Sequence, residues 1–368
     1  MDEKPYWVAF NSVRGIGAVR LQLLHDYFGN LEIAWDAPIE AFKEAGLNER
    51  VVESILHRRQ ILDVIGYYQK IIDSGIKIVL ETEEGYPRRL KDIAKPPPVL
   101  YIRGSYTMED EWAVSIVGTR RVTSYGKQVT TELANFLARN GITVISGLAR
   151  GVDSIAHQNA IDAGGRSIAI LGCGVDCIYP PENRKVAEEM IQRGALISDY
   201  APGTPPDAKN FPPRNRIISG LGLATVVIEA GERSGALITA SFAVEQGREV
   251  FAVPGPIYAP QSKGTNALIQ QGAQPFLSPE ELLELLNLEM VDEQKSTRHE
   301  LQAEPFEAEI LELIQNEPLH VDEICDLCDE PVERVSATLI IMELKGLVRQ
   351  ADEMKYQAIM ENAARYHL

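Results

Sequence analysis

Short apolar segments rich in β-branched residues alternate with amphipathic segments through the middle of this chain, from residue 112 to residue 276. Each apolar segment ends at Gly, Ser or Asp and is apolar on both faces, which is the pattern of a strand buried on both sides. These segments predict strands at 114–117, 142–147, 166–172, 194–198, 223–230 and 249–255. The segments between them predict helices at 124–140, 152–163, 182–193, 214–221 and 234–247. The alternation is typical of an α/β fold, with a doubly wound, mostly parallel sheet covered on both faces.

Helical patterns precede and follow this region. Residues 5–75 predict short helices, and the turn at Gly15-Ile16-Gly17 resembles half of a helix-hairpin-helix, although a plain helical bundle with a glycine turn explains the same pattern. Three consecutive prolines then lead into a predicted strand at 99–103. Three further helical patterns and a strand pair near the C-terminus predict a winged helix-turn-helix. The predicted domains are a helical domain at 1–80, the sheet domain at 81–288, an acidic linker at 289–304 and the winged helix at 305–368.

The net charge of −17 is distributed unevenly along the chain. Residues 112–276 contain 15 Lys and Arg against 13 Asp and Glu, whereas residues 277–368 contain 7 against 22. A polyanion is therefore compatible with the sheet domain and repelled by the C-terminal region. Arg334 and Lys345 are the only basic residues along the would-be recognition helix of the predicted winged helix, near 331–345. We expect that domain to contact protein or to restrain access to the sheet domain, and not to bind DNA itself.

Two broad classes of protein are disfavoured by composition. No apolar run reaches the roughly 18 residues of a membrane helix, and the N-terminus is acidic, so we expect a cytoplasmic protein without membrane contact. The four cysteines form two pairs, Cys173 with Cys177 and Cys325 with Cys328, in different predicted domains, which disfavours a disulfide framework. The second pair could supply two metal ligands, but no further pair follows at zinc-site spacing, so we expect core packing and no metal.

The loops after the predicted strands carry the candidate chemistry, because ligands of such folds bind beyond the carboxyl ends of the strands. These loops combine glycines, arginines and helix starts, which suit phosphate groups. The dinucleotide fingerprint is absent, since Gly172-Cys173-Gly174 is followed by Cys177 where a third small residue is required. We therefore expect no NAD and no other cofactor. The candidate DNA-binding residues are Gly118, Thr119, Arg120, Arg121, Ser146, Gly147, Arg150, Gly151, Arg184, Lys185, Phe211, Arg214, Asn215, Arg216, Ser234 and Gly235.

Two of these loops add an aromatic ring and a Pro-Pro pair to their cations, at 179–185 and at 211–216. Alternating cations and aromatic faces suit a single strand, in which phosphates and unstacked bases are both accessible. Asp153 and His157 lie four residues apart and could perform acid/base chemistry, but an acid near a helix N-terminus with its i,i+4 partner is the more economical interpretation.

Five motifs occur in a characteristic order: GTRR, SGLARGVDSIAH, GCGVDCIYPPENR, FPPRNRIISG and EAGERSGALITA. Together they closely resemble the bacterial DNA-processing protein A family, also called DprA or Smf, over nearly the whole chain. The resemblance implies an extended Rossmann-type fold that binds single-stranded DNA in a basic pocket, forms a homodimer and loads RecA recombinase in natural transformation. It assigns the pocket to Arg120 or Arg121, to Arg150, and to Arg214 or Arg216.

An enzyme is the alternative interpretation. Related phosphoribohydrolases of the lysine-decarboxylase-like group have a Gly-Gly-x-Gly-Thr loop followed at once by a catalytic Glu. Here the corresponding helix begins at Ser234-Gly235 and the next acid is Glu245, so a general acid or base is missing from the expected place. We therefore expect a binding protein and not an enzyme.

Overall fold

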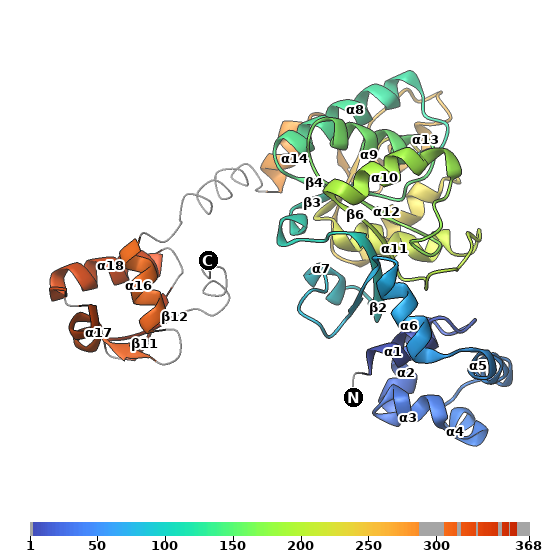
Figure 1. Cartoon of the computed structure of the whole chain (residues 1–368). Coiled ribbons are helices and arrows are strands. Elements are labelled where there is room, and N and C mark those ends of the chain that lie inside the picture. The colour runs from blue at the N-terminus through green and yellow to red at the C-terminus, as the bar shows by residue number, and fades with distance from the viewer. Residues whose placement is uncertain are drawn as a thin grey trace. The chain divides into compact units, whose positions relative to one another are not determined.

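The structure is a computed structural model, and it describes residues 3–286, 305–314, 318–328, 330–344, 348–352 and 354–358. The chain forms two compact units, Met1–Val291 and Asp292–Leu368, which are described separately below (Figure 1). The finer domain boundaries expected from the sequence stay predictions, and the expected linker at 289–304 lies outside the described residues.

The first unit is built on a nine-stranded sheet with the order β1-β2-β6-β5-β4-β3-β7-β8-β9. In chain order the strands are β1 (Lys77–Leu80), β2 (Val99–Gly104), β3 (Ala113–Val117), β4 (Thr143–Ser146), β5 (Ser167–Ile170), β6 (Ala195–Ser198), β7 (Ala224–Val227), β8 (Glu249–Ala252) and β9 (Gln274–Pro275). Strands β3 to β9 pair in parallel, whereas β2 pairs antiparallel with both β1 and β6. The expected mostly parallel sheet is therefore confirmed.

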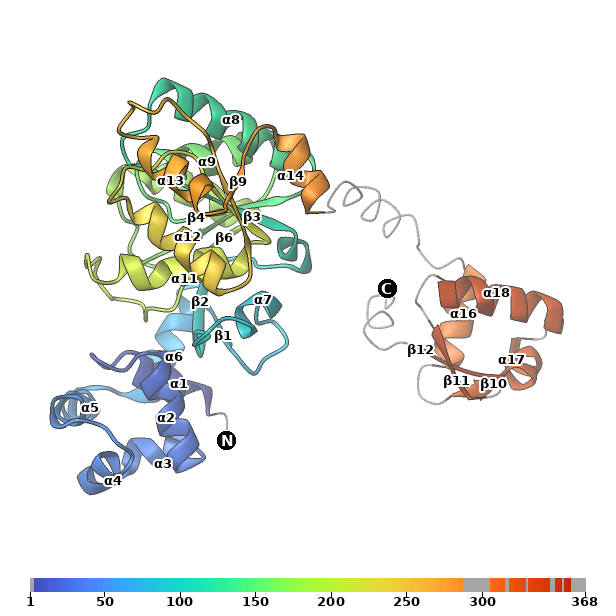
Figure 2. The same ribbon diagram turned by 180° about the vertical axis from the view of Figure 1, so that it is seen from behind.

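Helices cover both faces of this sheet, giving three layers (Figures 1 and 2). One face carries α8 (Ser124–Arg139), α9 (Val152–Asp162) and α10 (Arg184–Arg193), and the other carries α11 (Phe211–Leu221) and α12 (Gly235–Glu245). Three shorter helices accompany the outer strands: α7 (Arg88–Lys91) between β1 and β2, α13 (Lys263–Gln270) between β8 and β9, and α14 (Pro279–Leu285) after β9.

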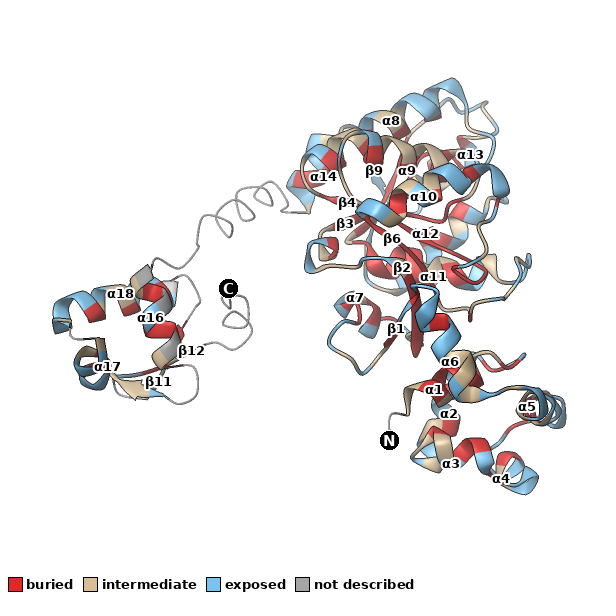
Figure 3. Ribbon diagram, in the orientation of Figure 1, coloured by how far each residue is buried: buried red, intermediate tan, exposed pale blue. Residues whose placement is uncertain are grey.

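Alternation along each strand divides its side chains between the two layers. In β3, Val114 and Ile116 pack with Leu133 of α8, whereas Ala113 and Val117 pack with α11 and α12. The strands β3 to β7 are accordingly buried along their whole length (Figure 3). Burial on both faces explains why these strands consist of uninterrupted apolar residues.

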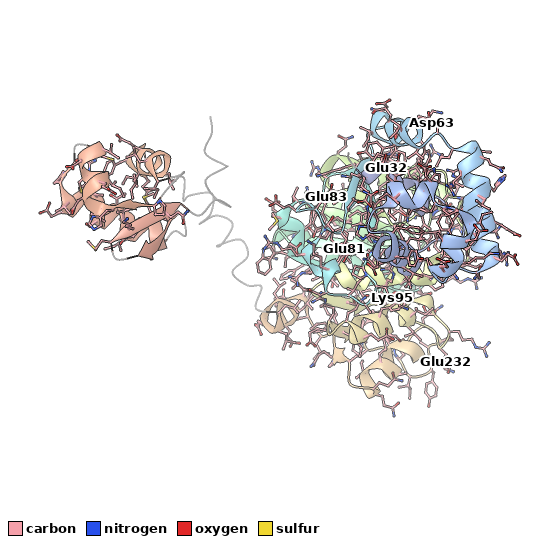
Figure 4. The ribbon with its side chains drawn as sticks, turned by 90° about the horizontal axis from the view of Figure 1, so that it is seen from below. Glu32, Asp63, Glu81, Glu83, Lys95 and Glu232 are labelled. Carbon is pink, nitrogen blue, oxygen red and sulfur yellow. The ribbon has the colours of Figure 1, made fainter. Side chains whose placement is uncertain are left out.

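Six helices precede the sheet: α1 (Lys4–Asn11), α2 (Ala18–Phe28), α3 (Leu31–Asp36), α4 (Ile39–Glu44), α5 (Glu49–Ile61) and α6 (Val64–Asp73). Their apolar core is continuous with Val99 and Tyr101 of β2. The carboxylate of Glu83, labelled in Figure 4, accepts a hydrogen bond from Lys4 Nζ at 2.7 Å and another from Leu80 N at 3.0 Å. The helices and the antiparallel edge of the sheet therefore share one core.

The local predictions differ from the structure in a few places. Strands β1 and β9 and helix α13 were not predicted, because each is short and has little periodicity. Helix α11 begins at Phe211 and not at Arg214, since Pro212 and Pro213 occupy its first turn, where a missing N–H costs nothing.

The second unit contains α16 (Pro305–Leu313), β10 (Leu319–His320), α17 (Val321–Cys328), α18 (Val332–Leu344), β11 (Val348–Asp352) and β12 (Lys355–Ala358). Its three strands form an antiparallel sheet of order β10-β12-β11, which confirms the winged-helix arrangement. Cys325 and Cys328 are partly buried against its core. On α18, Arg334 forms an ion pair with Glu330 and lies 4.6 Å from the ring centre of Phe306. Lys345 lies outside the described residues.

None of the helices that the structure describes combines the length and the apolar character needed to span a bilayer.

A buried ion pair joins the amino edge of the sheet to the segment before β3. Asp110 is fully buried, and its two carboxylate oxygens each accept a hydrogen bond of 2.8 Å from Arg166. Asp110 also accepts from Thr143 Oγ1 and from Thr107 N, both at 2.8 Å. Because Arg166, Thr143 and Thr107 all donate to this buried carboxylate, loss of its charge weakens several hydrogen bonds at once.

We therefore expect the Asp110→Asn variant to lower the free energy of unfolding by about 3 kcal/mol, as measured by urea denaturation. The matched control is Glu109→Gln, an exposed acid one residue earlier, which should change it by less than about 0.5 kcal/mol. Equal stability of the two variants would show that the Asp110 network is dispensable.

Candidate nucleic-acid interface

The candidate site lies where the order of the strands in the sheet reverses. After β3 the chain continues through β4, β5 and β6 on one side, and β7 returns to pair with β3 on its other side. The loops that follow β3 and β7 therefore lead away to opposite sides, which opens a crevice at the carboxyl ends of these two strands. A cavity of about 770 Å³ occupies this position.

The loops after six strands, β3 to β8, and the starts of two helices line the cavity. The loop after β3 contributes Gly118, Thr119, Arg120 and Arg121, and the α11 start contributes Phe211, Arg214 and Asn215. Ser234 and Gly235, at the start of α12, also line the cavity. Asn215 Nδ2 donates to Gly235 O at 3.3 Å and so joins the two helix starts. The structure thus brings together residues that are more than 100 positions apart in the sequence.

Arg214 forms the floor of the site. It is only 4% exposed, and Nη1 donates to the carbonyl of Ile170 at the end of β5. Its Nε has no hydrogen-bond partner among the described residues. Burial lowers the pKa of Arg214, the nearby Asp153 opposes this, and the positive charge of Arg120 lowers it further. The incompletely paired guanidinium is therefore suited to an anion.

Glycine is required beside this arginine for a steric reason. A Cβ atom placed on Gly147, directly after β4, would lie 2.1 Å from Arg214 Nη1. Gly172, which follows β5 closely, similarly leaves room for Phe211, with 2.8 Å between a would-be Cβ and the ring. The two glycines let side chains of α11 lie directly against the strand ends.

An aromatic pair forms one wall of the cavity. The rings of Tyr179 and Phe211 stack with 5.7 Å between their centres and 30° between their planes. The guanidiniums of Arg120 and Arg214 lie 6.0 and 5.9 Å from the centre of the Phe211 ring. Tyr179 is 37% exposed, so its outer face is open to a ligand. Cations and aromatic faces therefore meet at one place in the cavity.

Three further arginines at the cavity are exposed: Arg120, Arg121 and Arg233. Within the described part of the chain none of them has an acidic partner. Like charges gathered without counter-charges repel each other, and an anion in the cavity removes this repulsion.

Several predicted residues lie elsewhere. Arg216 is not part of the cavity lining: Nη2 donates to Asp199 Oδ2 and Nη1 to the carbonyl of Lys95, which is labelled in Figure 4, both at 2.8 Å. Ser146 is fully buried and its hydroxyl donates to Ile116 O at 2.6 Å. Of the two arginines that the resemblance offers for this place in the pocket, Arg214 lines the cavity and Arg216 does not.

The remaining predicted residues lie at the rim or support it. Arg150 lines a small adjoining pocket and forms an ion pair with Glu182. Arg184 and Lys185 are exposed at the start of α10, outside the cavity lining. Gly151 has a positive φ of 78°, and a Cβ atom there would lie 2.4 Å from Thr119 O, so it supports the loop after β3.

Asp153 and His157 have separate partners and do not form an acid/base pair. Asp153 accepts hydrogen bonds from Gly147 N and Ala149 N, which hold the loop after β4. Burial raises the pKa of Asp153, against the effect of Arg214. His157 is fully buried and accepts from Leu148 N through Nε2, while Nδ1 lies 2.8 Å from Ser167 Oγ. Both residues therefore support the floor of the site.

Sequence reasoning missed cavity residues whose signals are weak. Tyr179, Arg233 and Thr239 lie within the motifs but are not among the candidate residues, and Gln261 belongs to none of the motifs. Arg233 could have been found, because it directly precedes the Ser234-Gly235 helix start. Nothing in the sequence singles out Gln261, which a separate loop brings to the site.

Comparisons with known proteins identify the family of this chain. The family described as DNA recombination-mediator protein A matches residues 77–287, and the DprA winged helix domain matches residues 294–353. Protein Smf of Synechocystis is 35% identical over 97% of this chain and 99% of its own length. The DNA processing protein DprA of Bacillus subtilis is 44% identical over 58% of this chain and 72% of its own length.

Solved structures give the same result. DNA processing protein A of Streptococcus pneumoniae has a TM-score of 0.66 and 28% identity, covering 77% of this chain and 97% of the other. DNA processing protein A of Helicobacter pylori, described for its single-stranded DNA binding mode, has a TM-score of 0.53 and 33% identity, covering 57% and 95%. Fold and site define a doubly wound α/β protein with a cationic crevice at the switch point of its sheet. The chain belongs to the DNA recombination-mediator protein A family.

The environment of His157 predicts a pH dependence of stability. Burial, with a smaller effect of Arg214, lowers the pKa of His157 to about 3, whereas an unfolded His has a pKa near 6.5. The folded state therefore binds fewer protons, and the stability contributed by neutral His157 is complete above about pH 6.5 and falls as the pH decreases toward 3.

We expect His157→Gln to reduce the loss of unfolding free energy between about pH 7.5 and about pH 5 by about 2 kcal/mol relative to the unmodified protein. Urea denaturation at both pH values measures this difference. If the two proteins lose the same stability, His157 is not the neutral buried group described above.

Proposed function

We propose that this chain is a non-enzymatic recombination mediator that binds single-stranded DNA in the cavity at the switch point. The observation that carries the proposal is the convergence of Arg120, Arg121 and the buried Arg214 beside the Tyr179–Phe211 ring pair. Guanidiniums neutralise phosphates, and aromatic faces stack with bases. Bases offer their faces to a protein only when the strand is single, because a duplex stacks them on each other.

Family membership and the description of the Helicobacter pylori structure support the same ligand. From the family resemblance we further propose that the protein acts as a homodimer and transfers the bound strand to RecA recombinase in natural transformation. RecA filament formation on a strand covered by a single-strand-binding protein measures this step. A mediator must bind the strand before transfer, so the cavity is the first part to test.

The enzyme alternative is less well supported by the site. Glu245, the first acid along the helix that begins at Ser234-Gly235, is the last residue of α12 and does not line the cavity. Asp153 does line it, but its carboxylate already accepts two backbone hydrogen bonds. For the winged helix we retain the proposal of a protein contact, because Arg334 of α18 is occupied by Glu330 and Phe306.

The Arg120→Ala, Arg121→Ala double variant tests the phosphate contacts. It should weaken binding of a fluorescent oligothymidylate by about tenfold or more and lower the slope of log affinity against log salt by about 1.4, that is, about 0.7 per phosphate contact. Fluorescence anisotropy at several salt concentrations measures both quantities.

The matched control is the Arg139→Ala, Arg193→Ala double variant. Both arginines are exposed at the C-terminal ends of α8 and α10, and hence at the amino edge of the sheet, away from the cavity. It removes the same charge from the unit and should leave the salt slope unchanged. Equal effects of the two double variants would indicate net charge and not a site.

Tyr179→Leu tests base stacking separately from phosphate contact. The ring should contribute about 1 to 3 kcal/mol to binding of an ordinary strand, because its exposed face is free to stack with a base. On an oligonucleotide with abasic positions the variant and the unmodified protein should bind alike, since the phosphates remain and the stacking partner is gone. An identical loss on both strands would contradict stacking and indicate a packing role for Tyr179.

A further inference from the structure

Glu229 is a buried acid directly behind the cationic loop, and it does not line the cavity. It lies two residues beyond the end of β7 and is 3% exposed. Burial of a carboxylate is unfavourable unless it is well hydrogen-bonded, so its partners indicate what it does.

The partners of Glu229 are the two ends of the loop after β3. At the first end, its backbone carbonyl accepts from Thr119 N at 2.8 Å. At the second end, its carboxylate accepts from Thr123 N at 2.9 Å and from the Thr123 hydroxyl. Between these two points lie only Arg120, Arg121 and Val122, so a single residue holds both ends of the segment that presents the two exposed arginines.

The hydroxyl of Thr123 couples this clamp to helix α8. Because its hydrogen is donated to Glu229, its lone pairs accept the N–H of Gly126 at 3.2 Å, which caps the helix. Gly126 in turn leaves space for the acid, since a Cβ atom there would lie 2.5 Å from the Glu229 carboxyl group. The carboxylate, the cap and the glycine therefore form one fitted unit.

We propose that Glu229 is a positioning residue for strand binding, acting through Thr119 and Thr123 on Arg120 and Arg121. This inference rests on the proposed function. A flexible loop would have to be ordered each time a strand binds, and a loop already held in place avoids this cost. The acid itself carries the wrong charge to bind phosphate, so its benefit is geometric.

The direction in which DNA affinity changes on removal of Glu229 distinguishes a positioning role from a simple charge effect. If Glu229 acted only as a negative charge near the cavity, its removal would raise the affinity for DNA. As a positioning residue, Glu229→Ala lowers the affinity for the oligothymidylate by about tenfold. Glu229→Gln should retain most of the affinity that Glu229→Ala loses. The Gln oxygen still accepts from Thr123 N, and the Gln amide can donate to the Thr123 hydroxyl.

A double-mutant cycle distinguishes positioning from general destabilisation. Glu229→Ala is combined with the Arg120→Ala, Arg121→Ala variant, and affinity is measured at low salt, where that variant still binds. We expect no further loss in the combined variant, because the groups that Glu229 positions are already gone. A loss of the same size with and without the arginines overturns the proposal, as does higher affinity of Glu229→Ala.

Thr123→Val provides the same test if Glu229→Ala does not fold. It removes the hydroxyl and keeps the bond from Thr123 N, so we expect a smaller loss that also disappears without the two arginines. Unchanged affinity of Thr123→Val in that case overturns the proposal. If the unmodified protein does not bind the strand, the proposed function fails and this inference fails with it. If it binds and depends on Arg120 and Arg121 while Glu229→Ala binds equally well, only the inference about Glu229 fails.

Discussion

The central constraint on this structure is the burial of the Arg214 guanidinium at the carboxyl ends of the strands. A cation in an apolar core is unfavourable unless its surroundings supply oxygen atoms and charge. Here the carbonyl of Ile170 and the nearby Asp153 supply them in part, and Gly147 leaves the necessary space. Asp153 is itself held by the backbone of the loop after β4, so that loop is shaped around the arginine. An incompletely paired cation in this position makes the crevice attractive to anions before any ligand arrives.

The layers of the fold explain how one crevice collects residues from so many loops. Parallel strands end at one edge, and the reversal of strand order beside β3 separates two neighbouring loops there. Helix α11 begins beneath this gap, and its first turn carries Phe211 while its second carries Arg214 and Asn215. The same turn places Arg216 on the other side of the helix, where Asp199 pairs with it. A difference of two residues on one helix thus separates a cavity residue from a structural one.

Charge is distributed along the chain in a way that suits a protein with more than one kind of contact. The cationic crevice lies in a region of nearly balanced charge, whereas residues 277–368 carry 22 acids against 7 Lys and Arg. At physiological salt, exposed charges more than about 8 Å apart are largely screened from each other, so each region interacts mainly with the molecules that touch it. A polyanion therefore favours the crevice, and a protein surface suits the acidic winged helix better than a nucleic acid does.

The sequence by itself determined the fold class, since runs of apolar residues ending at glycine and separated by amphipathic segments are compatible with few architectures. It also predicted that the chemistry lies in the loops after the strands, because parallel strands bring those loops to one edge. Tertiary structure alone decided which arginines share a cavity. Arg214 and Arg216 are alike in the motif, and only packing against Gly147 on one side and Asp199 on the other distinguishes them. Glu229 reaches the loop after β3 through the pairing of β3 with β7, and Gln261 reaches the cavity because β8 pairs with β7. A local pattern contains no information about the pairing of β3 with β7, because the paired residues are more than 100 positions apart.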